Sequence, residues 1–354
     1  MYDIPVVGTH SVQICRSVSR WSSGTFTEVS VLSAYISVIE KSKHFLYFEN
    51  QFFVTSFSEE ASQVFNQLGL ALFRRILAAH KAGERFHIFV VLPLTPGFPG
   101  KIVDRDAVAL RRVMEFQYRC LVKDDGTALL QRLDAAGIDY RLYISFHGLR
   151  TFGVLEGRYV TEEIYVHSKV LIADDAVAIV GSANINDRSF AGDRDTEVAV
   201  VISDAIKVKT RMNGETHYAS KSVFELRCQL FEEHLGLQAS AGLSSEDQLG
   251  HYHLVVEDPL CDKFLADVWL GQSAENTRIF REAFHPIPDD TITTLADLQT
   301  YQRLQNPPFA EQTKLLAGIR GTLTDFPLYY FSKFGLQEAV TISPDAFFPY
   351  DLFC

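Results

Sequence analysis

The sequence predicts an α/β protein, with a mixed and mostly parallel sheet that carries helices on both faces, followed by a mainly helical C-terminal extension. Between about residues 29 and 205, apolar residues at helical spacing alternate with short aliphatic or aromatic runs. Strands separated by helices assemble into parallel or mixed sheets covered on both faces. Beyond that point the pattern is mainly helical. We therefore expect a lobe over residues 1–205 and an extension over 206–354 packed on it.

The first elements follow this alternation closely. Residues 28–43 have helical spacing, and the aromatic-rich run 44–56 is typical of a strand. A long amphipathic helix is predicted over 61–83, ending at a glycine, the residue most common just after a helix. The apolar run 86–94 predicts a buried strand, which the loop TPGFPG ends.

The later elements are predicted by the same patterns. Residues 106–137 are predicted to be mainly helical, and residues 138–146 form a strand. Another strand is predicted at 196–202, and helices at 222–237 and 262–284.

Residues 164–184 interrupt the alternation, because two strand-like runs flank the polar pair Asp174-Asp175, which favours a tight turn. The segment is therefore predicted to be a β-hairpin. Its first strand carries His167 and Lys169, two residues apart, so their side chains leave the same face. A turn at this pair makes the numbers of facing residues sum to about 349 or 350.

This register places Gly181 opposite the lysine and brings Ser182 and Asn184 close to both residues. A phosphodiester needs such a set of groups. Lysine supplies positive charge for the non-bridging oxygens, and a hydroxyl and an amide donate hydrogen bonds to them. Histidine is able to attack phosphorus or protonate the leaving oxygen. Glu197, on the next strand, is placed to accept the ring N–H of a histidine.

A histidine and a lysine at this spacing are common by chance, and solvated strand faces often look like this. The complete pattern is much more specific, because six fixed residues occur within 18 positions as H-x-K-x4-D-x6-G-S-x-N. They are His167, Lys169, Asp174, Gly181, Ser182 and Asn184.

The pattern resembles the HKD motif of the phospholipase D superfamily, and its context is similar to the second HKD motif of eukaryotic phospholipases D. Further blocks resemble that family in the family's order, from about residue 10 to the chain end. They are CRSVSRWSSG, YFENQFF, LPLTPGFPG, ISFHGLRT, GDRDTEVAVVI and, in outline, the tail from TDFPLYYF to DLFC.

The resemblance implies roles for individual residues. His167 would protonate the departing headgroup alcohol and then activate water, while the histidine of the other motif is phosphorylated. Lys169, Ser182 and Asn184 would bind the phosphate, and Glu197 would orient a histidine. Asp174 would be structural and hold the turn. The signature-block residues Glu49, Asn50 and Gln51 would either line the site or satisfy ordinary polar contacts, and His147 is expected to have a loop role.

One departure from the family matters most. The family carries two HKD motifs in one polypeptide, whereas this sequence contains one. The resemblance therefore covers the second catalytic half only. A first half would come from the same longer chain, from a separate fragment or, less favoured, from a second copy of this chain, as in one-motif members that form homodimers.

Composition limits the remaining alternatives. The net charge of −11 disfavours a nucleic-acid partner, which leaves nucleases less favoured than lipid-cleaving members. Five scattered cysteines without CxxC spacing indicate reduced thiols. We expect no metal or other cofactor, no membrane span and no signal peptide. The expected setting is cytoplasmic and peripheral at membranes, where the substrate is a phospholipid.

Two functions remain open at this point. The leading one is phosphatidylcholine hydrolysis to phosphatidic acid and choline, with transfer to other alcohols as a side reaction. The alternative is a catalytically incomplete lobe that binds phosphate or lipid headgroups, or pairs with a separate first half. An exposed apolar face at the place where the first half docks would mark such an incomplete unit.

Overall fold

A computed structural model describes residues 8–57, 64–102, 104, 107–123, 126–237 and 254–333. The end of the aromatic tail, with Cys354, and the first three residues of the helix predicted at 61–83 lie outside the described residues. The four cysteines within them are free thiols.

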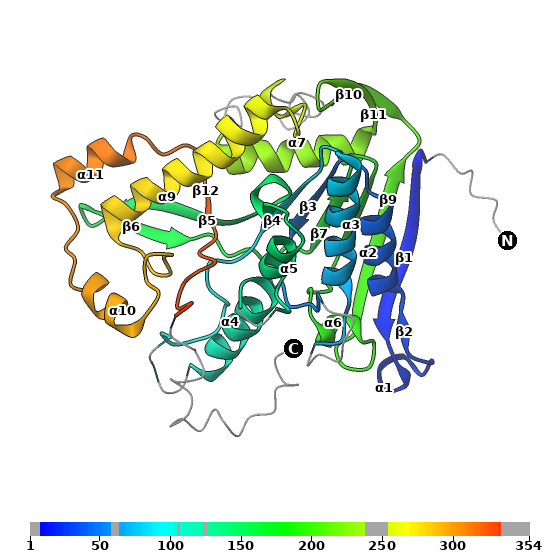
Figure 1. Ribbon diagram of the computed structural model, residues 1–354, viewed down its shortest axis with the longest axis horizontal. Helices are drawn as coiled ribbons and strands as arrows, with labels where there is room; N and C mark the ends of the chain where they lie inside the picture. Colours follow the sequence, from blue (N-terminus) through cyan, green and yellow to red (C-terminus); the bar gives the residue numbers. More distant parts are fainter. Residues whose placement is uncertain are drawn as a thin grey trace.

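A ten-stranded mixed sheet forms the centre of the molecule, in the order β12-β5-β4-β3-β7-β8-β9-β1-β2, with β6 paired to β5 (Figure 1). The two parallel pairs, β3–β4 and β4–β5, lie in its core, and the pairs on either side are antiparallel. The α/β class and the mixed sheet with a parallel core are therefore confirmed. The strands are β1 His10–Val18, β2 Glu28–Val29, β3 Phe45–Glu49, β4 His87–Val91, β5 Ile144–Leu155, β6 Arg158–Glu163, β7 Val170–Ala173, β8 Val177–Gly181, β9 Glu197–Asp204 and β12 Leu323–Asp325; β10 Lys207–Met212 and β11 Glu215–Ser220 form a separate hairpin.

Helices pack on both faces of this sheet. The longer ones are α2 Ser30–Lys41, α3 Leu68–Ala82, α4 Val108–Leu121, α7 Lys221–Leu235 and α9 Gly271–Phe284. The shorter ones are α1 Arg20–Ser23, α5 Leu129–Ala135, α6 Asp187–Phe190, α10 Leu295–Tyr301, α11 Phe309–Leu316, the 3₁₀ turns η1 Tyr140–Leu142 and η2 Leu254–Val256, and the π-helix η3 Lys263–Leu270. No helix in these described ranges is long and apolar enough to cross a membrane.

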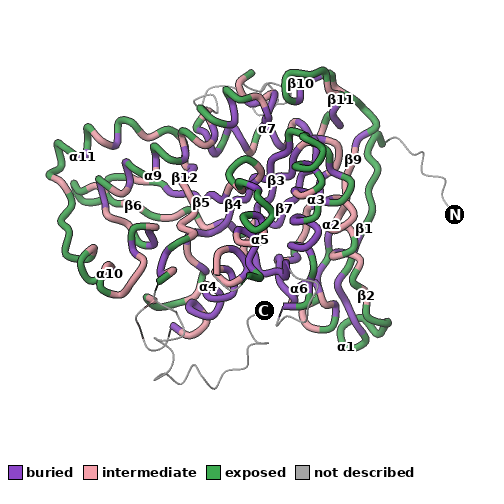
Figure 2. Tube along the Cα trace, viewed as in Figure 1, coloured by how far each residue is buried: buried purple, intermediate pink, exposed green. Residues whose placement is uncertain are grey.

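Strand β3 shows how the sheet divides two cores. Its residues alternate between the faces. Leu46 and Phe48 enter a core with α2, α3, α4 and α5, whereas Phe45 and Tyr47 enter a second core with α7 and η3. All five residues of β3 are buried, as Figure 2 shows for the central strands, so this strand anchors the loop that follows it.

Residues beyond 205 take part in both the sheet and the second core. Strand β12 pairs with β5, and the fully buried Trp269 of η3 packs against Phe89 and Phe231. Nothing in the structure tests the boundary placed near residue 205, which therefore stays a prediction.

Several predicted elements have different bounds, such as the strand predicted at 44–56, which ends at Glu49, and the cause is clear for two others. The helix predicted from residue 61 begins at Leu68 within the described residues, because the backbone amides of Phe65 and Asn66 donate to the Asp187 carboxylate at 2.6 and 2.8 Å. The strand predicted at 138–146 starts only at Ile144, after a 3₁₀ turn that Asp139 caps by accepting from the Arg141 amide.

Candidate active site

The candidate residues gather at one edge of the sheet. Because β3 runs antiparallel to β7, β7 to β8 and β8 to β9, the ends of β3 and β8 lie beside the starts of β7 and β9. Glu49 ends β3, Gly181 ends β8 and Glu197 begins β9, with Lys169 immediately before β7. This edge is where parallel strands of an α/β sheet commonly present a ligand site.

The hairpin has the predicted turn and a register in which partner numbers sum to 350, as in the pair Val170–Val180. His167 and Lys169 differ from prediction in one respect, since they precede the strand, which starts at Val170. The Gly181 amide nevertheless donates to the Lys169 carbonyl at 3.2 Å, so the extended pairing continues to the lysine. The extended backbone thus still brings the lysine opposite Gly181.

His167 and Lys169 differ strongly in exposure. His167 is exposed, and its ring is stacked at 6.3 Å on Tyr165 with an interplanar angle of 27°. Lys169 is buried, and its Nζ donates to the His167 carbonyl at 2.6 Å and to Gln51 Oε1 at 3.1 Å. The Gln51 amide in turn donates to the Tyr165 hydroxyl at 2.9 Å. Gln51 therefore links the lysine to the residue that supports the histidine.

Burial lowers the pKa of Lys169, and the negative charge of Glu197 opposes this shift. No carboxylate in the described part of the chain forms a salt bridge with Lys169. Its charge is thus held near the site by an amide and a carbonyl, which leaves it able to attract an anionic ligand.

Ser182, Glu197 and Asn184 complete this edge. The Ser182 hydroxyl donates to one oxygen of Glu197 and accepts from the Val198 amide at 3.1 Å, while Ser189 donates to the other Glu197 oxygen at 2.7 Å. Glu197 forms no hydrogen bond with a histidine among the residues described. The Asn184 side-chain oxygen is buried without a hydrogen-bond partner there. The side-chain NH2 of Asn184 is the group able to donate to a phosphate oxygen.

Gly181 is required by close packing. A Cβ at this position would lie 2.6 Å from Ala199 Cβ and 2.6 Å from the Val198 carbonyl oxygen. Glycine therefore lets β8 approach β9 and fixes the position of Ser182, the next residue.

Glu49 lies beneath the motif, within a buried hydrogen-bond network. One of its oxygens accepts from Tyr47 at 2.5 Å and from His234 Nε2 of α7 at 2.9 Å, and the other accepts from Ser168. Burial acts to raise the pKa of Glu49, but hydrogen bonds from His234, Ser168 and Tyr47 hold this pKa below its usual range. Glu49 is therefore placed to position the motif rather than to contact a ligand directly.

Sequence reasoning did not identify Ser168, Tyr47 or His234 as parts of this network. Strand alternation contains a signal for one of them, because Tyr47 lies two residues before Glu49 on the same face of β3. His234 comes from a helix 185 residues away in sequence, and no local pattern predicts its contact with Glu49.

Asn50 acts on the backbone. Its Oδ1 accepts from the amides of Phe52 and Ile185 at 3.2 and 3.1 Å, and the side chain is fully buried. It thereby ties the loop after β3 to the loop that carries Asn184. Asn50 was expected either to line the site or to make ordinary polar contacts, and this geometry corresponds to polar contacts within the fold.

The two aspartates of the hairpin turn have separate structural contacts. Both have positive φ, at 54° and 51°, a conformation that aspartate tolerates better than most residues. Asp174 accepts from the backbone amides of Lys43, His44 and Phe45 at 2.7–2.8 Å. Asp175 forms a fully buried ion pair with Arg227 at 2.6 Å.

His147 lies on β5 and is buried, so the expected loop role is wrong. Trp269 donates to its Nε2 at 3.0 Å, and its Nδ1 is 2.9 Å from the Ser273 hydroxyl. Burial lowers the pKa of His147 to about 3, which keeps it neutral. It is a core residue that joins β5 to η3 and α9.

A metal centre would need several ligating side chains in one place. Within the described ranges there is no group of three or more His, Cys, Asp or Glu residues arranged to hold a metal ion.

Comparison with known proteins shows to which family the chain is similar. A family model described as phospholipase D matches residues 8–151 and 154–250. The chain is 40% identical over 345 residues to phospholipase D1 of Mus musculus, covering 96% of this chain and 31% of that protein. It is also 40% identical to phospholipase D zeta 2 of Arabidopsis thaliana, covering 90% of this chain and 31% of that protein.

A solved structure, the phospholipase D family member Nuc of Salmonella typhimurium, is a much more distant match. It is 17% identical with a TM-score of 0.26, and the match covers 55% of this chain and 84% of that one.

The sheet edge, with its histidine, lysine, serine and asparagine, defines a site suited to a phosphate group. The chain belongs to the phospholipase D family. It spans about a third of the length of the curated relatives it matches.

Proposed function

We propose that this chain supplies the second HKD half-site of a phospholipase D that hydrolyses phosphatidylcholine to phosphatidic acid and choline. The observation that carries the proposal is the convergence of His167, Lys169, Ser182 and Asn184 on one sheet edge, in a chain with one HKD motif. A phosphodiester placed there would have a cation and an amide for its oxygens and an accessible imidazole for proton transfer.

The reaction would proceed in two displacements. The histidine of the first half-site attacks phosphorus, and the bond to the choline oxygen breaks while His167 donates a proton to that oxygen. This yields a phosphatidyl-histidine and choline. His167, now neutral, takes a proton from water as the water oxygen attacks phosphorus. The phosphorus–nitrogen bond then breaks, which releases phosphatidic acid and restores the first histidine.

The positions of individual residues support these roles. His167 is exposed, and its ring has no hydrogen-bond partner within the described part of the chain, so it is free to meet a leaving oxygen. Lys169 and Asn184 would hold the non-bridging oxygens, and Ser182 would contribute where its hydroxyl is released from Glu197. Glu197 would become available to orient a histidine in the same rearrangement. An alcohol in place of water would give the transfer reaction.

The first half-site would dock on an exposed apolar face beside the site. Val12 and Ile14 of β1 and Val198 of β9 are exposed, on the sheet face opposite to the buried Cys15 and Ala199. Figure 2 shows β1 exposed along much of its length. Exposed β-branched side chains on a sheet face are usually covered by another part of the protein. The relatives are about three times longer than this chain, so a first-motif lobe would cover this face.

A second candidate function is a lobe that binds phosphate or phospholipid headgroups without turnover. The single HKD motif favours it, because one histidine alone cannot be both the phosphorylated group and the acid. In this case the addition of a separate first half would not produce choline release.

Choline release from phosphatidylcholine vesicles tests these alternatives, with His167→Ala as the control and the mass in solution recorded. Activity from a dimer, lost in the control, would mean that two copies build one site. A well-folded inactive monomer that gains activity when a first-motif fragment is added would support the half-site. A monomer that binds phosphate but remains inactive with that fragment would support the second function, a lobe that binds without turnover.

A further inference from the structure

We propose that Trp21, Phe26 and Phe65 form an aromatic rim that inserts into a phospholipid surface and holds the sheet edge of the candidate site against it. This inference rests on the proposed function, because a site for a bilayer phospholipid must face the bilayer. It names the residues that would make the contact.

The rim residues are unusual in their exposure. The exposed fractions of Trp21, Phe26 and Phe65 are 67%, 96% and 79%. No other phenylalanine or tryptophan in the described residues exceeds 50%, the value for Phe309. Most large aromatic side chains are instead buried in the two cores on either side of the sheet. Exposure of three such rings in water is unfavourable unless another apolar phase receives them.

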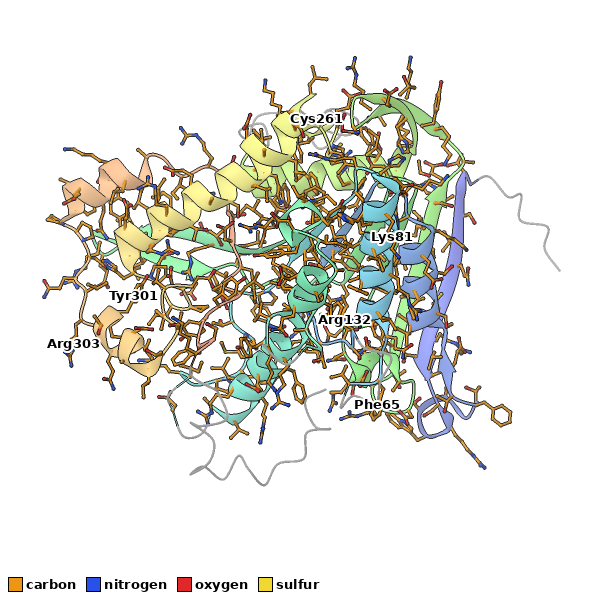
Figure 3. The ribbon with its side chains drawn as sticks, viewed as in Figure 1. Phe65, Lys81, Arg132, Cys261, Tyr301 and Arg303 are labelled. Atoms are coloured by element: carbon orange, nitrogen blue, oxygen red, sulfur yellow. The ribbon has the colours of Figure 1, made fainter. Side chains whose placement is uncertain are left out.

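All three rings lie at the sheet edge that carries the HKD residues. Trp21 is in α1, directly after β1 ends, and Phe26 lies between α1 and β2. Since β1, β9, β8 and β7 are successive neighbours, the end of β1 is three strand spacings, or about 15 Å, from the start of β7. Phe65 precedes α3, whose start lies at the same edge, and Figure 3 labels it there.

Hydrogen bonds tie two of the rim residues to the site loops. The Trp21 indole N–H donates to the Asp193 carbonyl at 2.9 Å, and the segment after Asp193 leads into Glu197. The Phe65 amide donates to the Asp187 carboxylate at 2.6 Å, three residues beyond Asn184. The rings are therefore presented outward on a backbone fixed relative to the catalytic residues.

A lipid surface fits this rim better than a charged partner does. Tryptophan and phenylalanine side chains favour the membrane interface, where the ring leaves water and the polar groups stay hydrated. The net charge of −11 provides no bulk attraction to anionic lipids, and Arg20 is the exposed cation beside Trp21. Binding driven by apolar burial should therefore depend little on salt.

Intrinsic fluorescence offers a direct test on the intact chain. The chain has two tryptophans, of which Trp269 is fully buried, so a change on adding lipid reports on Trp21. With phosphatidylcholine vesicles we expect the emission to shift to shorter wavelength, and brominated phosphatidylcholine to quench it. Both effects should persist between low and high salt.

Substitutions test whether the rim residues, and not exposed aromatic rings in general, bind the vesicles. Phe26→Ser combined with Phe65→Ser should lower vesicle partitioning at least ~10-fold, because burial of one phenylalanine is worth more than a factor of ten. The matched control is Phe309→Ser combined with Tyr218→Ser, which removes two exposed rings away from this edge and should leave partitioning unchanged. Near-ultraviolet circular dichroism checks the folding of both variants.

Three results would overturn the proposal. The first is an emission spectrum that does not change with vesicles, and the second is an equal loss of vesicle partitioning in the control variant. The third is an emission shift produced by a first-motif fragment without lipid, which would assign the rim to the lobe interface. Vesicle binding by His167→Ala separates this question from catalysis. Vesicle binding without any choline release, even after a first-motif fragment is added, would reject the proposed function and keep the rim.

Discussion

Glu49 and His234 are joined by a buried hydrogen bond, with Glu49 Oε1 2.9 Å from His234 Nε2, and the second Glu49 oxygen accepts a hydrogen bond from Ser168, the residue between His167 and Lys169. A carboxylate on β3 and an imidazole on α7 thereby fix the backbone on which both motif residues are carried. Removal of this support should affect the geometry of the site more than the stability of the fold.

Ser168→Ala tests this support. The substitution removes the hydroxyl that joins Glu49 to the motif, and we expect kcat of the complete enzyme to fall about tenfold with little change in KM. Ser222→Ala is a matched control, because the Ser222 hydroxyl is buried without a hydrogen-bond partner among the described residues. Steady-state kinetics on phosphatidylcholine vesicles provide the measurement. Equal kcat values for the two variants would contradict a positioning role.

The stability contributed by Glu49 should depend on pH in a defined direction. Its folded pKa lies below the ordinary value of 4.5, so its ionised form stabilises the fold fully above pH 4.5. This contribution is lost as the pH falls through the lowered folded pKa. Urea unfolding should show Glu49→Gln to be less stable than the parent by about 1–3 kcal/mol at pH 7. The difference should shrink in acid, and a constant difference down to pH 3 would rule out the ionised Glu49 as its source.

The sequence allowed the central part of the fold to be predicted because the relevant signals are local. The hairpin at residues 164–184 and its register follow from one polar turn, Asp174-Asp175, and from apolar runs on each side. Strands β1, β2, β6, β10, β11 and β12 were not predicted. In β1 the alternation of polar and apolar side chains is limited to residues 11–14, and β12 has three residues, so neither gives a pattern long enough to indicate a strand.

The same distinction applies to the site. The motif pattern identified the groups that meet at the sheet edge, but not their supports. His234 and Arg227 both come from α7. They contact Glu49 and the turn residue Asp175, which are distant in sequence, so these contacts depend on tertiary packing. Sequence also did not indicate that Lys169 is buried and bonded to Gln51, because burial depends on the loop after β3.

Lys169 should make phosphate binding sensitive to alkaline pH. Burial lowers its pKa from the ordinary 10.5, so the amine loses its charge at a lower pH than an exposed lysine does. Affinity for inorganic phosphate, measured by calorimetry, should therefore decline as pH rises toward 10. Lys169→Met should abolish this dependence together with most of the binding. Lys169→Arg should bind phosphate without the alkaline decline, because guanidinium remains charged. If the phosphate affinity of the parent and of Lys169→Arg declined with pH in the same way, this lysine would be excluded as the titrating group.

Asp175 should contribute strongly to the stability of the fold through its buried ion pair with Arg227. The Asp175 carboxylate and the Arg227 guanidinium are both fully buried, 2.6 Å apart, and Arg227 also donates to the carbonyls of Val256 and Glu257. Asp175→Asn leaves the arginine charge without its counterion in the core, which typically costs about 3–5 kcal/mol. Chemical denaturation should show a loss of this size. Glu275→Gln is the matched control, because it breaks an exposed pair with Arg278 at 2.7 Å and should cost much less. Similar small losses in both variants would mean that the buried pair does not hold α7 against the hairpin turn.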